Sequence, residues 1–395
     1  MPDQHAANGL TASGAHRWLV CTPSAKLEQQ FPNKTSKYAE EGTVAHAAAE
    51  LTARYFLGQC SEMAFENELD QLMKSEYFDG EMREAAGDYA RLIFSRRDEA
   101  LKSCEDPQVF LETRLDFGVF VPGSFGTGDC VILSEPVLEV IDFKYGKGTP
   151  VYADQNPQMR LYALGAWLAY GDLYDFTTVR MTIFQPRIRE QPSVYEESVD
   201  DLLAWAGKVV KPAADLAAEG LGEFVPGEET CRFCRAKQKC RARAEQNLKL
   251  FDENPEPLIL SLKEAGEILK KAKDIEAWLK DLKALVTGTL ISGGEVPGWK
   301  LVEGRSTRKL AGEDEVLKAM TEAGYDASLL YEKKLLTLTQ LEKDFGKKEI
   351  ARVLGGLIVK PAGAPQLAPE SDKRPAFTPA GAVIAAFDEG EDNEE

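Results

Sequence analysis

Two acidic residues and a lysine lie at the ends of two neighbouring apolar runs of the sequence. Asp129 opens the first run, and Asp142 lies near the end of the second, with Lys144 two positions later. Because side chains alternate along a strand, Asp142 and Lys144 would share one face. Two carboxylates can bind a hard divalent cation, and the lysine could then reach an attacking water or a scissile phosphate. This pattern predicts metal-dependent phosphodiester cleavage, against the simpler alternative of two strands that end in solvated charges.

A helix with polar residues one turn apart follows this group. Pro157 favours a helix start, and Gln158 and Tyr162 are then four residues apart on one helical face. Further upstream, His46 lies in an Ala-rich stretch of high helix propensity. Taken alone, such a histidine is more often structural than catalytic.

In this order the residues resemble the RecB-type branch of the PD-(D/E)XK nuclease superfamily. Its pattern is a histidine on a helix, an Asp, an acid-x-Lys and then Gln-x-x-x-Tyr. The resemblance implies an Mg²⁺ or Mn²⁺ site with His46, Asp129 and Asp142 as ligands, completed by the backbone carbonyl of Phe143, and makes Lys144 the catalytic lysine. It also implies that Gln158 and Tyr162 position the DNA strand. Glu112 could lie near the site on an earlier strand, but its pattern fits an exposed strand residue better.

Four of the seven cysteines form a second pattern. Cys231, Cys234 and Cys240 are spaced Cys-x2-Cys-x5-Cys, and Cys21 lies far upstream. This layout resembles the iron-sulfur staple of AddB-type and CRISPR-adaptation nucleases, which implies that Cys21 and the other three bind a 4Fe-4S cluster that closes the nuclease domain. A structural Zn²⁺ is the competing assignment, because four cysteines serve both groups. Disulfides fit least, given an odd cysteine count and no secretory signal or transmembrane run.

The overall charge is at first sight unfavourable for a nucleic-acid partner. The chain of 395 residues has a formal net charge of -18, yet phosphate contacts depend on local patches rather than on the sum. Residues 231–243 carry six basic residues and no acid, which makes them a candidate DNA track or only a solvated face. These residues are Arg232, Arg235, Lys237, Lys239, Arg241 and Arg243.

The order of elements predicts an α/β fold. Helices are expected over residues 38–105, strands near 108–116, 129–134 and 137–145, then the Gln158 helix, a strand at 178–185 and a helix at 199–218. This order fits the αβββαβ PD-(D/E)XK core, a mixed β-sheet flanked by helices. We expect a nuclease domain over residues 1–250, a mainly helical accessory region over 251–358, and a Pro/Ala-rich, acidic and disordered tail over 359–395.

The accessory region has its own local signals. Ser261-Leu262-Lys263-Glu264 and Thr339-Gln340-Leu341-Glu342 read as capping boxes. The first would open a long helix with an apolar seam, and the second would open a helix over 339–354. A further helix is expected near 313–323, and a strand from Trp299 to Arg305.

From His16-Arg17-Trp18 through Glu41-Gly42-Thr43 to Gly298-Trp299-Lys300, nearly the full chain is similar to a phage and prophage family of predicted RecB-type nucleases. The likeness favours a DNA exonuclease over a site-specific endonuclease, acting on single-stranded or duplex DNA ends in phage recombination, replication or repair. It also implies the bacterial cytoplasm and not a membrane. A phage single-strand annealing or binding protein would be its partner. The alternatives are a DNA-binding or scaffold protein with a vestigial site, and a nuclease for RNA.

Overall fold

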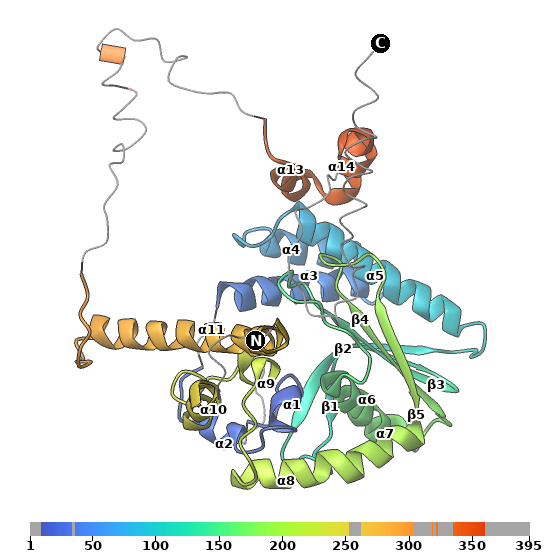
Figure 1. The fold of residues 1–395 in the computed structure, drawn as a ribbon. Helices are drawn as coiled ribbons and strands as arrows, with labels where there is room; N and C mark the ends of the chain where they lie inside the picture. The colour runs from blue at the N-terminus through green and yellow to red at the C-terminus, as the bar shows by residue number, and fades with distance from the viewer. Residues whose placement is uncertain are drawn as a thin grey trace.

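A five-stranded mixed sheet forms the centre of the protein in a computed structural model, which describes residues 9–33, 36–252, 262–302, 318, 321–322 and 335–359 (Figure 1). The strands lie side by side in chain order. Only β3 and β4 are parallel, and every other neighbouring pair is antiparallel. The strands are β1 (Gln108–Asp116), β2 (Phe125–Ser134), β3 (Val137–Phe143), β4 (Thr178–Phe184) and β5 (Ser193–Ser198).

Helix α6 (Pro157–Tyr170) connects the parallel strands β3 and β4. A parallel pair needs such a crossover, because the chain must return to the starting edge of the sheet. The side chain of Asn156 caps the helix by accepting hydrogen bonds from the N–H groups of Gln158 and Met159. The crossover thereby carries the start of α6, with Gln158, to the carboxyl end of β3.

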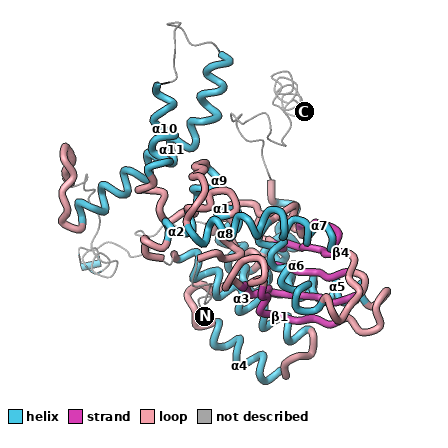
Figure 2. The backbone as a smooth tube through the Cα atoms, turned by 90° about the horizontal axis from the view of Figure 1, so that it is seen from below, coloured by secondary structure: helices cyan, strands magenta, loops and turns pink. Residues whose placement is uncertain are grey.

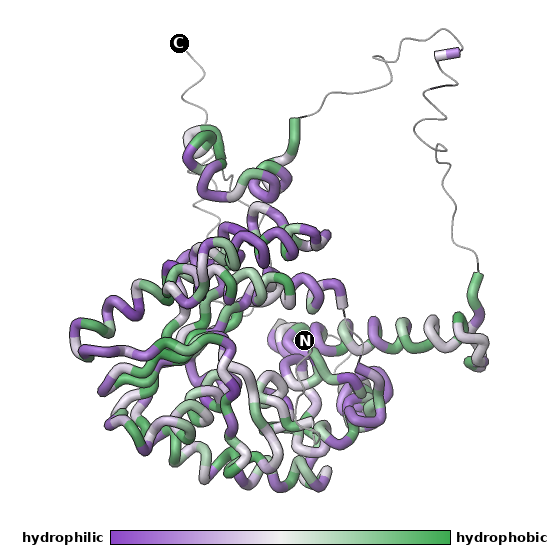
Figure 3. The backbone as a smooth tube through the Cα atoms, turned by 180° about the vertical axis from the view of Figure 1, so that it is seen from behind, coloured by the Kyte–Doolittle hydropathy of each residue, from purple (hydrophilic) through white to green (hydrophobic). Residues whose placement is uncertain are grey.

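Helices cover both faces of the sheet. Leu133 and Val140 point to the face covered by α6, whereas Ile132 and Ile141 point to the opposite face, which is covered by α3 (Lys37–Phe56) and α5 (Gly80–Ala100). The alternation follows the period of two along each strand. Figure 3 shows the strands as the most hydrophobic part of the fold, between helices of mixed character.

The remaining helices of this domain extend the two layers. Helix α4 (Glu62–Leu72) packs on α3. A continuous helical rod of α7 (Val199–Trp205), a π-helical turn (Ala206–Val210) and α8 (Lys211–Glu219) lies on the face of α6.

The N-terminal helices α1 (Ala15–Trp18) and α2 (Ser24–Glu28) lie against the cysteine segment that contains α9 (Glu228–Arg232). The hydroxyl of Thr22 donates a hydrogen bond of 2.6 Å to the carbonyl of Leu221, and the carboxylate of Glu28 accepts one of 2.6 Å from the N–H of Arg235. Two segments about two hundred residues apart are therefore joined.

Two further helices extend away from the sheet. Helix α10 (Arg241–Asp252) contacts α11 (Leu262–Ile291), and Figure 2 shows both standing apart from the main body. The helical hairpin of α13 (Leu338–Phe345) and α14 (Lys347–Leu354), followed by a short 3₁₀ turn (Gly355–Leu357), instead packs on α5. None of the helices in the described ranges combines the length and the apolar character needed to span a membrane.

The structure corrects two local predictions. Residues 299–302 of the expected strand form no strand; Trp299 and Val302 are exposed, without a neighbouring strand to pair with the backbone. The capping box at Thr339 was wrong as well. The helix begins at Leu338, because Thr337 and Gln340 cap each other's backbone N–H groups, and Gly346 then separates α13 from α14.

One strand was missed, and several expectations fall outside the described residues. Strand β5 was not expected, although it pairs with β4 over its whole length. The Ser261 capping box, nearly all of the 313–323 helix, residues 303–305 and almost the whole 359–395 tail lie outside the described residues.

Candidate active site

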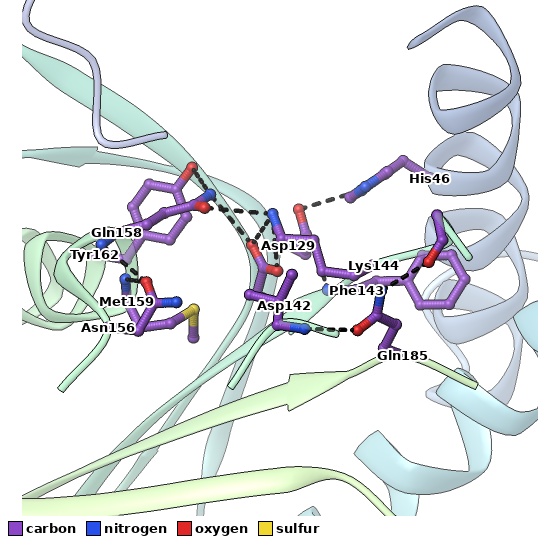
Figure 4. A network of polar contacts seen from close by, with 12 residues as sticks. His46, Asp129, Asp142, Phe143, Lys144, Asn156, Gln158, Met159, Tyr162 and Gln185 are labelled. Atoms are coloured by element: carbon purple, nitrogen blue, oxygen red, sulfur yellow. Dashed lines mark hydrogen bonds and ion pairs between the residues drawn. The ribbon is translucent and has the colours of Figure 1, made fainter. Parts of the chain in front are cut away.

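Asp142 and Lys144 meet at the carboxyl end of β3 (Figure 4). Asp142 is the second-last residue of the strand and is 2% exposed. The ammonium Nζ of Lys144 lies 3.2 Å from Oδ1 and 3.1 Å from Oδ2 of this carboxylate. The N–H of Lys144 donates to the carbonyl of Phe184 on β4, which fixes the backbone just beyond the strand end. The two residues of the predicted acid-x-Lys pair therefore form a direct ion pair at this end of the strand.

Asp129 and His46 form a second pair beside the first. Nδ1 of His46, on α3, lies 3.3 Å from Oδ1 of Asp129, on β2. The other oxygen of Asp129 accepts a 2.7 Å hydrogen bond from the N–H of Phe143, and the Phe143 ring packs edge-on against the imidazole at 5.6 Å. The N–H of Phe143 thus orients Asp129, while the role expected for its carbonyl stays a prediction.

The His46–Asp129 pair holds a proton in this arrangement. Burial lowers the pKa of His46, but the neighbouring Asp129 carboxylate outweighs burial and raises the pKa to about 9. Burial raises the pKa of Asp129, but the charge of His46 and its hydrogen bond outweigh burial, so the pKa of Asp129 ends below its ordinary range. A cation bound here would displace the imidazole proton, since a histidine ligand must be neutral.

In the second pair, the pKa values of Asp142 and Lys144 are both raised. Asp142 is buried next to both the Asp129 carboxylate and the Lys144 ammonium. Burial raises the pKa of Asp142, and the nearby Lys144 charge only partly opposes this. Burial lowers the pKa of Lys144, but Asp142 outweighs it and the pKa rises, so the ammonium stays charged. Oδ2 of Asp142 is buried and has the Lys144 ammonium as a charged neighbour at 3.1 Å, but it makes no hydrogen bond of good geometry, so it can still accept from a water or bind an ion.

Gln158 and Tyr162 complete the group from α6. Oε1 of Gln158 accepts from Nζ of Lys144 at 3.4 Å, and its Nε2 donates to the Tyr162 hydroxyl at 3.1 Å. Gly126 on β2 explains how the helix approaches so closely, because a Cβ there would lie 2.4 Å from the Tyr162 ring. The structure thus brings together His46, Asp129, Asp142, Lys144, Gln158 and Tyr162.

Glu112 is an exposed residue of β1, as expected, and it also lies near this group, which the sequence favoured less. Ligand atoms of His46, Glu112 and Asp129 all lie within 4.8 Å of one another, although Glu112 itself is an exposed residue. Its φ of 48° is left-handed, an uncommon conformation for a residue other than glycine. Since Leu111 pairs with Cys130 and Thr113 with Gly128, Glu112 stands opposite Asp129. Counting the register of β1 against β2 could have identified it.

The four predicted cluster cysteines share one small pocket. Cys21, Cys231, Cys234 and Cys240 all line it, and the first three are buried. The N–H of Val225 donates to Sγ of Cys21 at 3.4 Å, and the N–H of Gly227 donates to Sγ of Cys231 at 3.5 Å. Burial raises the pKa of Cys231, and raises the pKa of Cys234 to about 12. The Cys231 and Cys234 thiols are therefore neutral without a bound group.

The predicted basic track is only partly on the surface. Arg243 was wrongly included, because it is buried and paired with Asp274 and Asp281. Arg235 lies 3.9 Å from Glu28, and Lys237 lies 3.5 Å from Asp281, whereas Lys239 is exposed. Arg232 has a different position, since it lines a cavity together with Lys144. A role of Arg235, Lys237 and Lys239 in DNA binding stays a prediction.

One family model matches most of the chain. The family model described as "Protein of unknown function (DUF2800)" matches residues 5–375. The chain belongs to this family. The matched residues include every group described above, from Cys21 to the α13–α14 hairpin.

Solved structures offer weaker likenesses for this DUF2800 member. A chain described as "Putative exonuclease" from Eubacterium rectale is similar at 14% identity, with a TM-score of 0.29, over 65% of this chain and 92% of that one. A second, SSO0001, is 14% identical with a TM-score of 0.20, over 56% of this chain and 95% of that one. Both TM-scores are too low for either likeness to assign a fold family or an activity.

Proposed function

We propose that this protein is a metal-dependent deoxyribonuclease with a PD-(D/E)XK core of the RecB type. The observation that carries the proposal is the contact of Lys144 with both oxygens of Asp142, at 3.1 and 3.2 Å, beside the His46–Asp129 pair. Residues from α3, β2, β3 and α6 converge on this point, in a mixed sheet flanked by helices. Such a group of acids and one ammonium suits a substrate with a phosphodiester.

The side chains present fit a hard divalent cation. His46, Glu112 and Asp129 offer ligand atoms that lie within 4.8 Å of one another and would hold Mg²⁺ or Mn²⁺, and we propose Asp142 as a further ligand beside them. The buried Oδ2 of Asp142 supports this fit, because its one charged neighbour is the Lys144 ammonium and it makes no hydrogen bond of good geometry. When bound, the cation would supply Lewis-acid activation of the attacking water and of the scissile phosphate.

The chain's own residues would then perform two tasks. Lys144 stays protonated beside Asp142, so its role is to stabilise negative charge that grows on the phosphate oxygens. Gln158 orients this ammonium through its amide oxygen, and Tyr162 holds the Gln158 amide in turn. Fixing the lysine in advance lowers the cost of ordering it during the reaction.

An iron-sulfur cluster is the cofactor we propose for the four cysteines, with Zn²⁺ as the alternative. The N–H groups that donate to Cys21 and Cys231 support a thiolate site, because such hydrogen bonds tune and stabilise cluster sulfurs. Anaerobically purified protein should contain iron and sulfide and absorb visible light, and Cys234→Ser should lose both. Cys104→Ser is the matched control outside the pocket. Zinc without iron would favour the alternative.

DNA ends are the substrate we propose, which makes the enzyme an exonuclease. Its role would be in phage recombination, replication or repair, together with a single-strand annealing or binding protein. The proposal is tested with single-stranded and linear duplex DNA labelled at one end, incubated with Mg²⁺ or Mn²⁺. The wild type should shorten the strands progressively, and Asp142→Ala and Lys144→Ala should abolish shortening while DNA binding remains.

The alternative is a DNA-binding or scaffold protein with a vestigial site. It would be favoured if the wild type bound DNA but left it intact with every metal tested. Cleavage of labelled RNA in preference to DNA would redirect the proposal to a ribonuclease.

A further inference from the structure

A cavity of about 560 Å³ opens directly beside the candidate active site. Lys144 and Gln158 form part of one wall. Arg17 of α1 and Arg232 and Phe233 of the cysteine segment also line the cavity, together with one acid, Glu229. Tyr152 lines it from the loop before α6. The cavity therefore connects the ammonium group of Lys144 with a surface made by both ends of the domain.

Two aromatic side chains that line this cavity are exposed. Phe233 is 66% exposed and Tyr152 is 55% exposed, although each stands in an ordered part of the fold. Phe233 lies between Cys231 and Cys234, both of which are buried. The cysteine segment therefore buries the Cys231 and Cys234 thiols and exposes the Phe233 ring to solvent.

Both aromatic rings have neighbouring side chains that hold them in place. The His16 ring meets Phe233 edge-on at 6.4 Å, and the Arg232 guanidinium carbon lies 5.9 Å from the phenyl centre. The guanidinium of Arg189 packs over the Tyr152 ring at 4.7 Å. Phe233 and Tyr152 are therefore positioned before any ligand arrives.

The loop that leads to Tyr152 is fixed by one buried amide. Gln185 is 2% exposed; its Nε2 donates to the carbonyls of Gly146 and Thr149, and its Oε1 accepts from the N–H of Val151. Three hydrogen bonds from one buried side chain leave this loop little freedom. Such rigid placement reduces the entropy lost when a ligand binds.

The chemistry of this cavity suits an unpaired nucleic-acid strand. Exposed aromatic faces beside cationic groups are what single-strand sites use, because unstacked bases pack on the rings while phosphates contact the cations. Bases within a duplex are already stacked and do not offer their faces. The volume also lies in the roughly 300–1,000 Å³ range of pockets that enclose small ligands, so it suits a strand end and not a duplex.

We infer that this cavity binds the unstacked end of a single nucleic-acid strand, with bases on Phe233 and Tyr152 and the following phosphate directed toward Lys144. The inference rests on the proposed nuclease function and names its substrate as a single strand. It also assigns the outward phenyl ring of the cysteine turn a role in substrate binding.

Binding measurements in a cleavage-deficient background test this inference. In Asp142→Asn protein with Mg²⁺, the Kd is measured for a fluorescent oligothymidylate and for a blunt duplex of the same length. Phe233→Ala and Tyr152→Ala should each raise the Kd for the strand about tenfold and change the Kd for the duplex less than about twofold. Phe233→Tyr should restore strand binding, which separates the ring from a folding defect.

Phe345→Ala is the matched control, because Phe345 on α13 is 60% exposed and does not line the cavity. It should leave both Kd values unchanged. The inference is overturned if Phe233→Ala and Tyr152→Ala leave strand binding unchanged, if strand and duplex binding weaken equally, or if the Asp142→Asn protein binds no strand.

Hydrolysis by protein that retains Asp142 separates this inference from the proposed function. Cleavage by the wild type with unchanged strand binding in Phe233→Ala would overturn the inference alone. Specific loss of strand binding, together with a wild type that cleaves nothing, would overturn the nuclease function alone.

Discussion

The amide oxygen of Gln158 lies 3.4 Å from the ammonium nitrogen of Lys144, although the two residues belong to different elements of the fold. The same amide donates to the Tyr162 hydroxyl and lies 3.5 Å from Oδ1 of Asp142. Helix α6 therefore sets the direction of the lysine that follows β3. This contact gives Gln158 a positioning role that can be separated from binding.

Replacing Gln158 with alanine should lower kcat about tenfold and change KM much less, because Lys144 loses an orienting partner and keeps its charge. Steady-state hydrolysis of labelled DNA measures both constants. Gln71→Ala is the control, since the hydrogen bond described for the Gln71 side chain on α4 is to Lys74, far from the site. A change confined to KM would assign Gln158 to substrate binding instead.

Glu112→Gln should weaken Mn²⁺ binding about tenfold, because it removes one of three ligand groups that lie within 4.8 Å of one another. Isothermal titration calorimetry with Mn²⁺ measures this directly and requires no activity. Glu105→Gln, an exposed change just before β1, should bind Mn²⁺ like the wild type. Equal affinity in both variants would remove Glu112 from the site.

The metal-free protein should show a pH dependence set by His46. Its pKa is about 9 in the folded chain against 6.5 for a free histidine, so folding favours the protonated form. The stabilisation by the His46–Asp129 pair is therefore fully present below about pH 6.5 and is lost as the pH rises through 9. With EDTA present, the Tm difference between wild type and His46→Gln should shrink over this window. A difference that grows with pH would contradict the assignment.

Glu84→Ala should loosen the α13–α14 hairpin. The Glu84 carboxylate accepts from the N–H groups of Lys347 and Lys348, at 2.8 and 3.1 Å, and so caps α14 from another helix. Losing such a cap costs about 1–2 kcal/mol. Hydrogen exchange should accelerate at amides 347–354 and remain unchanged in the central sheet. Glu99→Ala, on the far end of α5, serves as the control.

Local sequence patterns predicted much of the fold because the signals lay within single elements. β1 was expected over the residues it occupies, and the Gln158 helix begins at Pro157 as its proline indicated. β5 and the unpaired residues 299–302 were misjudged, because a strand depends on a neighbour that the local sequence does not specify.

The arrangement of the candidate site residues could be predicted where their spacing along one element determines on which face the side chains lie. This holds for Asp142 with Lys144 on a strand and for Gln158 with Tyr162 on a helix. Glu112 was underestimated because strand alternation assumes ordinary backbone angles, whereas its φ is 48°. The burial of Arg243 was also missed, because its partners Asp274 and Asp281 lie on a helix that charge counting cannot place.

The hydrogen bond from the N–H of Val225 to Sγ of Cys21 joins residues 204 positions apart in the chain. This separation has a consequence for biosynthesis. A ribosome adds roughly 5–20 residues per second, so the first cysteine waits roughly 10–40 s for its partners. During that time the candidate site residues are translated, but Arg232 and Phe233, which line the cavity that we assign to the strand, follow only with the last cysteines. A nascent chain therefore completes the proposed strand cavity only after the cysteine segment has been translated.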